Sequence, residues 1–389
     1  MSARTLWLLT PAGQRLSGEF IDDTLKVRAG ERGMLDRLNL AGDFPRQRVE
    51  VVRGTDPETD VRERYYRRGW TDGLPVVAPT LERVDALLEH TTLGRHEVLG
   101  ELDPLKGVAT AEKVAANAVM AGCDPQHFAL VVAAVRAIAD PAFNLRGVQT
   151  TDENVAPVLV LSGPDAKRLE VNDTFGALGP GWRGSATVGR ALRLVMNNIG
   201  GGWPGAVSVA GLGQPARYSL CFAENEANSP WEPLRVEHGF DTSQTVLTVY
   251  RAETVINVTG GLEEVASVMG SAASAFSMAY GGKVVVVISP FTARALAERG
   301  LSKADVKRFL HERGRVPAAD FETFWLRQTI EASRWPDWLT AGSADGLLPV
   351  LQSPDDISVV VAGGDLAIAQ QAYLPTWGFP ACRVHQVVS

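Results

Sequence analysis

The chain has 389 residues, of which 45% are hydrophobic and 21% are charged, a composition typical of a globular protein that buries a full core. Its formal net charge of −7 argues against a nucleic-acid-binding surface, because such surfaces are basic. Only three cysteines occur and no CxxC pair is present, which argues against a disulfide framework and predicts a reducing, cytoplasmic location.

The first seventy residues are predicted to form a small N-terminal segment or arm that contains a strand. Their apolar run LWLL at 6–9 is too short for the central region of a signal peptide. No stretch of the chain approaches the ~18 apolar residues that a membrane span requires. Residues 71–389 are expected to form the main α/β region. If this region divides, we expect subdomains at 71–245 and 246–389.

Two successive helices are predicted next. The first covers residues 110–122 and ends at Gly122, and Asp124 followed by Pro125 is a typical start of a second, apolar helix over 126–140. Lys113 lies on the first helix, and Cys123 lies beside the start of the second, where the pKa of a thiol can be lowered. Both are second-rank catalytic candidates. The alternative for Cys123 is a small, buried apolar side chain.

The stretch GPGWRGSATVGRALRLVMNNIGGGWPG at 179–205 predicts a helix that runs to Asn197. Arg190, Arg193 and Asn197 are spaced three and four apart, so they share one face, and Arg183 lies near the positive end of the helix. Arginines in register suit a carboxylate or a phosphate. The alternative is a solvated arginine face. The substrate-binding candidates here are Arg183, Arg190, Asn197 and Asn198.

The stretch CFAENEANSPWEPL at 221–234 combines acidic, amide and aromatic side chains. Glu224 and Glu226 are two apart, so in an extended chain they point the same way. Two neighbouring carboxylates repel, which raises the pKa of one and creates an acid/base couple. The alternatives are a divalent metal ion held between them or a solvated loop. Further candidates in this stretch are Cys221 for catalysis, and Asn225 and Trp231 for substrate binding.

Four segments share one pattern, in which an apolar run leads through a small-residue turn into a helix-like stretch: 155–171, 253–269, 283–300 and 356–373. The repetition favours an α/β fold with mostly parallel or mixed sheets built from strand–tight turn–helix units. Gly260 and Gly261 lie in one such turn, where backbone N–H groups favour an anion. The alternative is that glycine only permits the tight turn.

Several classes of site have no sequence support. Neither GxGxxG nor a P-loop occurs, so no nucleotide cofactor is expected. The six histidines are scattered and form no HExxH motif, so a zinc site is not expected. The sequence therefore predicts no cofactor, with a divalent metal at Glu224 and Glu226 as the one alternative.

Several phrases taken together resemble a bacterial family of uncharacterised proteins that accompanies UGSC-motif domains, in which selenocysteine or cysteine sits in a redox-like motif. They include DGLPVVAPT, AEKVAANAVMAGCDPQHF, LGPGWRGSATVGRALRL, CFAENEANSPWEPL and SVVVAGGDLA. The resemblance runs from about residue 72 to the end and implies a thiol or selenol redox protein as a partner, without an established activity. Residues 1–65 contain neither UGSC nor CGSC. The family's late turn carries an extra glycine and a basic residue that AGGDLAIA lacks.

The leading hypothesis is a soluble, cytoplasmic enzyme of the lyase or hydrolase type, acting on a small anionic or polar metabolite by carboxylate acid/base chemistry. Glu224 and Glu226 would form the acid/base pair, and the arginines would hold the anion. The alternatives are a subunit or partner of a thiol or selenol redox system and a non-catalytic anion-binding protein. A homo-oligomer is expected, with no nucleic-acid or membrane partner.

Overall fold

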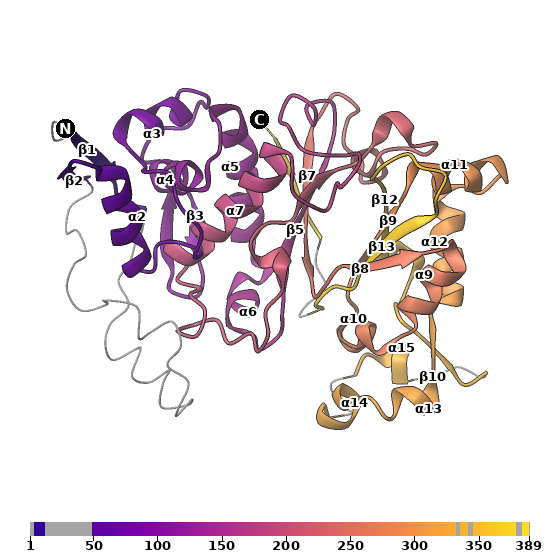
Figure 1. Ribbon diagram of the computed structural model, residues 1–389. Coiled ribbons are helices and arrows are strands. Elements are labelled where there is room, and N and C mark those ends of the chain that lie inside the picture. The colour runs from indigo at the N-terminus through magenta and orange to yellow at the C-terminus, as the bar shows by residue number, and fades with distance from the viewer. Residues whose placement is uncertain (1–3, 12–48, 332–334, 341–344, 379–382, 389) are drawn as a thin grey trace. The chain divides into compact units, whose positions relative to one another are not determined.

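A computed structural model describes residues 4–11, 49–331, 335–340, 345–378 and 383–388. The chain contains helices and strands throughout and forms mixed sheets, as the predicted α/β class requires (Figure 1). In this part of the chain, no single helix has the length and apolar composition to cross a membrane. One pair of helical segments, Pro125–Ala139 and Pro141–Thr150, has the required length and composition when taken together, but the two segments are bent by 71°.

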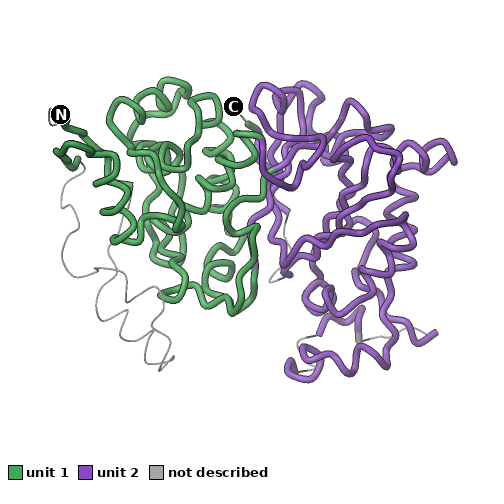
Figure 2. The backbone as a smooth tube through the Cα atoms, in the orientation of Figure 1, with its two compact units in different colours: residues 1–154, 182–221, 388–389 green, residues 155–181, 222–387 purple. Residues whose placement is uncertain are grey.

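The chain forms two compact units that interleave along the sequence (Figure 2). Unit 1 comprises residues 1–154, 182–221 and 388–389, and unit 2 comprises residues 155–181 and 222–387. The chain thus passes from one unit to the other four times, and each unit is assembled from segments that are distant in sequence.

Unit 1 is mainly helical, with two small antiparallel strand pairs. The first pair joins β1 (Arg4–Leu9) to β2 (Val49–Gly54), and the second joins β3 (Val98–Leu102) to β4 (Gly107–Thr110). The helices are α2 (Pro57–Arg67), α3 (Leu81–Leu88), α4 (Ala111–Ala121), α5 (Phe128–Ala139), α6 (Leu145–Thr150) and α7 (Arg183–Asn198).

The two helices predicted around Gly122 are confirmed. Thr110 caps α4 by accepting a hydrogen bond from the Lys113 N–H, and Gly122 ends the helix with a φ of +91°, a conformation that glycine adopts without strain. Asp124 and Pro125 then lead through a short 3-10 turn into α5. Nearly every residue of α4 and α5 is buried. Apolar and small side chains cover most of both helices, and α4 also buries Glu112 and Asn117.

Unit 2 contains two four-stranded sheets. One has the order β12-β9-β13-β8 and the other β14-β7-β5-β6. The strands are β5 (Ala156–Ser162), β6 (Cys221–Ala223), β7 (Val246–Ala252), β8 (Ile256–Thr259), β9 (Val284–Ile288), β12 (Ile357–Val361), β13 (Gln370–Leu374) and β14 (Val384–Val387). The first residue of β6 belongs to unit 1. β12 pairs with β9 in parallel, whereas β13 pairs antiparallel with both β9 and β8.

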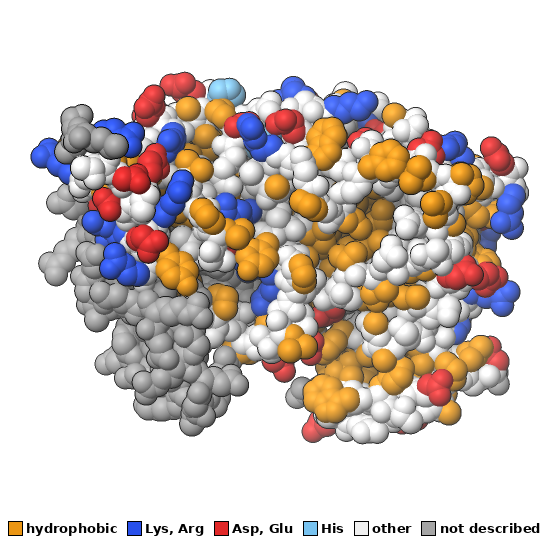
Figure 3. Space-filling view, viewed as in Figure 1, with side chains coloured by type: hydrophobic (Ala, Val, Ile, Leu, Met, Phe, Trp, Pro, Cys, Tyr) orange, Lys and Arg blue, Asp and Glu red, His pale blue; other side chains and the backbone are white. Residues whose placement is uncertain are grey.

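Helices pack against the β12-β9-β13-β8 sheet to form the core of unit 2. Val284, Val286 and Ile288 alternate along β9 and share one cluster with Leu262 and Leu310. The helices are α8 (Leu234–Glu237), α9 (Leu262–Met269), α10 (Ala275–Tyr280), α11 (Pro290–Glu298), α12 (Lys303–Arg313), α13 (Ala318–Phe321), α14 (Trp325–Thr329) and α15 (Asp337–Thr340), and a small sheet pairs β10 (Arg315–Pro317) with β11 (Leu347–Pro349). Figure 3 shows apolar side chains gathered on the viewed face of this unit.

The predicted repetition of strand–turn–helix units is not confirmed as a rule for this chain. Segments 253–269 and 283–300 each hold a strand followed by a helix, namely β8–α9 and β9–α11. In segment 155–171, β5 leads into a series of turns, and in segment 356–373, β12 leads back into the sheet as β13. In the second case the backbone of β13 pairs with both β9 and β8. The buried Gln371 side chain adds hydrogen bonds with the Ser289 N–H and the Thr292 hydroxyl.

Candidate functional site

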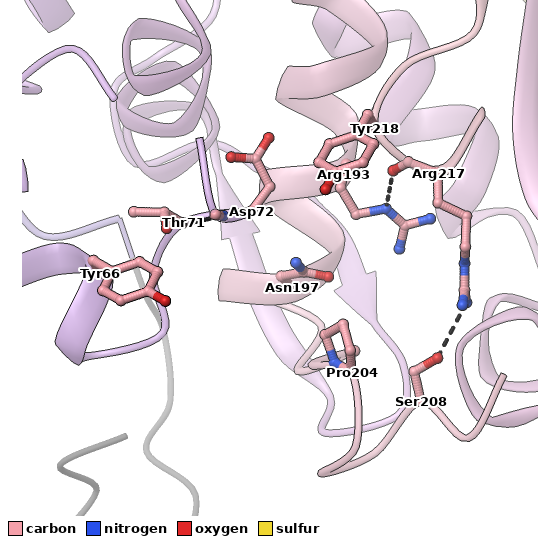
Figure 4. A pocket seen from close by; sticks show the side chains of 11 residues that line it. Tyr66, Thr71, Asp72, Arg193, Asn197, Pro204, Ser208, Arg217 and Tyr218 are labelled. Atoms are coloured by element: carbon pink, nitrogen blue, oxygen red, sulfur yellow. Dashed lines mark hydrogen bonds between the residues drawn. The ribbon is translucent and has the colours of Figure 1, made fainter. Parts of the chain in front are cut away.

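Unit 1 contains a cavity of about 350 Å³. It lies between the end of α2, the loop that follows α2, one face of α7, and the loop from 199 to 218. Figure 4 shows Tyr66 and Arg217 at opposite sides of the group, with Asn197 between them. The lining residues are Tyr66, Thr71, Asp72, Gly73, Arg193, Asn197, Gly202, Pro204, Ser208, Arg217 and Tyr218.

The glycine run at 200–202 lets the loop after α7 pack closely at the edge of this cavity. A Cβ atom at Gly202 would lie 1.7 Å from Oε1 of Gln149, and one at Gly201, whose φ is +84°, would meet the Leu105 side chain at 2.4 Å. Only glycine fits such close approaches. Trp203 then fastens the loop, since its indole N–H donates to the Gly69 carbonyl at 2.7 Å.

Arg193 and Asn197 are one helical turn apart on α7 and face the cavity together (Figure 4). They are 9% and 4% exposed. The Arg193 Nε donates to the Arg217 carbonyl at 2.8 Å. Within the described residues, however, Arg193 Nη2 and Asn197 Oδ1 are buried without any hydrogen-bond partner. Buried polar groups are normally hydrogen-bonded, so these two atoms of the cavity residues each keep an unused hydrogen-bonding position.

Asp72 also lines the cavity, but its carboxylate is already engaged. Arg190 holds it in a bidentate pair, with Nε to Oδ2 at 2.7 Å and Nη2 to Oδ1 at 3.0 Å. Two further donors of Arg190 reach the Pro75 and Ala121 carbonyls. The pair therefore neutralises Asp72 and fixes the loop after α2 against α7, rather than leaving Arg190 open to a ligand.

Positive charge dominates the cavity wall. The Arg217 guanidinium donates from Nη2 to the Ser208 hydroxyl at 3.1 Å, as the dashed line in Figure 4 marks. Burial, together with the neighbouring positive charge of Arg217, lowers the pKa of Arg193 to about 9, while Asp72 acts in the opposite sense. A negative charge beside Arg193 would oppose this lowering of the pKa, because an opposite charge favours the ionised form.

The described part of unit 2 has a cavity of about 280 Å³, lined in part by Ser289, Gly363, Gly364 and Gln371. These polar groups already have partners: Gln371 bonds Ser289 and Thr292, and the Gly363 N–H donates to the Asp173 carbonyl. Among the residues that the structure describes, no lining side chain has a buried atom without a partner. The cavity of unit 1 is therefore the stronger candidate.

The structure places the four arginine and asparagine candidates differently. Asn197 lines the cavity, and Arg190 lies behind it on Asp72. Arg183 pairs with Asp124 and has a side chain that is 56% exposed. Asn198 donates to the Trp70 carbonyl and to Oδ1 of Asn117, away from the cavity.

The sequence predicts Arg193 on the shared helix face but not as a binding residue, and it gives no signal for Arg217 or Asp72. Arg217 comes 24 residues after Arg193, in a loop, so no local spacing links the two. The contact of Arg193 with the Arg217 carbonyl forms only in the folded unit.

The second-rank catalytic candidates Lys113, Cys123 and Cys221 all lie in unit 1. The Lys113 ammonium donates to the Val108 carbonyl at 3.1 Å, and burial lowers its pKa. Burial raises the pKa of Cys123 and that of Cys221 to about 12, so both thiols stay protonated at neutral pH. A thiol in that state is a poor nucleophile.

Glu224 and Glu226 lie close together in unit 2. The Ser162 Oγ is 2.6 Å from Glu224 Oε2 and 3.0 Å from Glu226 Oε1. Glu224 also accepts from the Leu234 N–H at 2.8 Å, and Glu226 pairs with Arg235 at 2.5 Å. Burial raises the pKa of Glu224, opposed by the charge of Lys303, whose ammonium lies 3.9 Å from Oε1.

Lys303 belongs to a small buried cluster of charges. Its ammonium is 3.0 Å from Glu237 Oε2 and donates to the Glu232 carbonyl at 3.2 Å, and Lys307 contacts the other oxygen of Glu237. Burial lowers the pKa of Lys303, and the negative charge of Glu224 opposes this effect. Burial, together with the positive charge of Arg383, lowers the pKa of Lys307 to about 8. Neither Glu224 nor Glu226 lines a cavity described here, so their acid/base role stays a prediction.

The other candidates of unit 2 complete local turns. Asn225 Oδ1 accepts from the N–H and the side chain of Asn228, and the Trp231 indole donates to the Leu301 carbonyl at 3.0 Å. The Gly260 N–H donates to Ala369, and the Gly261 N–H donates to the Glu264 carboxylate at 2.7 Å. That turn therefore uses its own N–H groups rather than presenting them to an anion.

Across the described ranges, no group of three or more His, Cys, Asp or Glu residues is placed to hold a metal ion. Searches against protein-family models, curated proteins and solved structures found no match for this chain.

Proposed function

We propose that unit 1 binds a small organic anion in its cavity, with Arg193 as the principal contact. The observation that carries this proposal is the buried Nη2 of Arg193, which has no hydrogen-bond partner among the described residues. A buried guanidinium with an unused donor is costly, whereas a carboxylate or phosphate oxygen there would form a charge-assisted hydrogen bond.

The charge balance of the wall supports an anion over a cation. Arg193 and Arg217 both contribute positive charge, and the one carboxylate of the wall, Asp72, is paired with Arg190. An anion would also reduce the repulsion between the two guanidinium groups, which lie close enough to lower the pKa of Arg193. A cation would add to that repulsion.

The size and apolar content of the wall support an organic molecule. The cavity of about 350 Å³ lies within the range of small-molecule sites. Tyr66, Tyr218 and Pro204 supply apolar surface beside the arginines, and such a combination suits a carboxylate attached to an aromatic or aliphatic body. Arg193 would bind the charged end and the rings would cover the remainder.

Titration calorimetry with 3-phenylpropionate tests the proposal. The wild-type chain should bind this acid and should not bind the uncharged amide, 3-phenylpropionamide. Arg193→Met should weaken binding of the acid about 10- to 100-fold, because a hydrogen bond to a charged group contributes about 1.5–3 kcal/mol.

Arg183→Met is the matched control, since Arg183 starts the same helix but pairs with Asp124 at the surface. Its affinity should stay within about twofold of the wild-type value, as expected of an exposed ion pair. The proposal is wrong if the amide binds as well as the acid, or if Arg193→Met and Arg183→Met bind the acid equally.

The acid/base enzyme expected from Glu224 and Glu226 is a separate proposal for unit 2. What supports it is their shared contact with the Ser162 hydroxyl. It requires a substrate to reach that hydroxyl, and it fails if Glu226→Gln retains full turnover of a substrate once one is identified.

A further inference from the structure

We infer that the anion of unit 1 carries a hydroxyl group on the carbon next to its carboxylate, as in a 2-hydroxycarboxylate. The inference rests on the proposed function and concerns Asn197, one helical turn from Arg193. Side chains at this spacing are neighbours on a helix surface, so a carboxylate on Arg193 places its adjacent carbon beside the Asn197 amide.

Asn197 is the second orphan of the cavity. It is 4% exposed and lines the cavity, and its Oδ1 has no hydrogen-bond partner within the described part of the chain. A buried amide oxygen needs a donor, and an unsatisfied one costs about 1–3 kcal/mol. The neighbouring Asn198 does not line the cavity, and its amide nitrogen donates to the Trp70 carbonyl and to Asn117 Oδ1.

The surroundings restrict which donor fits. A 2-amino group would be charged, and its positive charge would meet Arg193 and Arg217. A 2-oxo group has no hydrogen to donate. A hydroxyl group is neutral and donates to Oδ1, and it can also accept from the amide nitrogen. It therefore satisfies Asn197 in either orientation of the amide.

Four acids of one shape test the inference by calorimetry on the full-length chain: 3-phenyllactate, 3-phenylpropionate, phenylpyruvate and phenylalanine. The wild-type protein should bind 3-phenyllactate about tenfold more tightly than 3-phenylpropionate, which lacks the hydroxyl group. Asn197→Leu, similar in size but without polar atoms, should reduce this ratio to about one while binding of 3-phenylpropionate changes less than threefold.

Two further variants keep the test decisive. If the leucine variant folds poorly, Asn197→Ala replaces it, and its affinity ratio of 3-phenyllactate to 3-phenylpropionate should also be about one. Thr187→Val should keep the wild-type ratio, because the Thr187 hydroxyl bonds the Arg183 carbonyl within α7 and Thr187 is not a lining residue.

The outcomes separate the two proposals. Equal affinity for 3-phenyllactate and 3-phenylpropionate, with no effect of Asn197→Leu, overturns the hydroxyl inference and leaves anion binding intact. Tighter binding of phenylpyruvate or phenylalanine than of 3-phenyllactate also overturns it. Failure of all four acids to bind overturns anion binding itself.

Discussion

Single residues in both units show how burial decides the chemistry of a charged group. Arg183 and Arg193 both belong to α7. Arg193 is 9% exposed and has a nitrogen without a hydrogen-bond partner among the described residues, whereas Arg183 forms an exposed ion pair. Their spacing in the sequence does not distinguish them. Only the loop at 199–218, which closes over Arg193, makes it the residue on which a buried anion would depend.

Glu224 illustrates the same principle with the opposite sign of charge. Burial raises the pKa of its carboxyl group above the value in the unfolded chain, so the folded state retains a proton that the unfolded state has lost. The contribution of Glu224 to stability is therefore fully present below the unfolded pKa and is lost as the pH rises through the folded pKa.

Glu224→Gln removes this titration while keeping the shape of the side chain. We expect the free energy of unfolding of the variant, relative to wild type, to rise between pH 5 and pH 8, with a slope of at most about 1.4 kcal/mol per pH unit. Urea unfolding at several pH values measures the difference. Glu263→Gln, whose carboxylate side chain is 67% exposed, should show no such trend. A difference that falls with pH for Glu224→Gln contradicts the assignment.

At the scale of elements, the sequence predicts helices whose ends are determined by residues close together in the chain. Thr110, Gly122 and the Asp124–Pro125 pair define α4 and α5, and their capping bonds span only a few residues. Segment 356–373 instead forms β12 and β13, and the contacts of β13 are distant in sequence. Gln371, for example, bonds Ser289 and Thr292, some 80 residues away. Likewise, Arg193 and Asn197 share a face that spacing predicts, whereas Asp72 joins Arg190 across 118 residues, beyond the reach of any local pattern.

The glycine loop after α7 gives an element-scale prediction. Gly202→Ala would place a Cβ atom 1.7 Å from Gln149 Oε1, and the Gln149 amide cannot move freely because it donates to the Asp103 carbonyl at 2.5 Å. We expect a loss of about 2–3 kcal/mol in the free energy of unfolding, together with weaker binding of 3-phenylpropionate.

Gly211→Ala is the control for this substitution. The added Cβ atom would lie 3.9 Å from the nearest atom, the Asp152 carbonyl oxygen, which is an ordinary contact. Its effect should stay within about 0.5 kcal/mol, as measured by urea unfolding. Equal stability of the two variants would show that the loop does not depend on the close approach at Gly202.

At the scale of the whole molecule, the interleaved units determine which fragments can carry the site. Residues 1–154 form the first segment of unit 1, but they lack α7 and the loop that provides Arg217. Residues 1–221 contain every residue that lines the cavity and the hydrogen-bond partners named above for it.

We therefore expect the fragment 1–154, unlike the full-length chain, to show neither binding of 3-phenylpropionate nor cooperative unfolding. Calorimetry and circular dichroism measure the two properties. Binding by the shorter fragment would contradict the assignment of the cavity, because that fragment has neither Arg193 nor Asn197.

The order of segments also affects the chain while it is being synthesised. The strand β5, all of whose residues are buried, ends at Ser162, and its partner β7 begins only at Val246. At about 5–20 residues per second, the ribosome takes roughly 4–17 s to supply the 83 intervening residues, 163–245. During that interval the sequence APVLVLS has no ladder partner from β7. The nascent chain thus presents an apolar, β-forming segment of the kind that chaperones shield against aggregation.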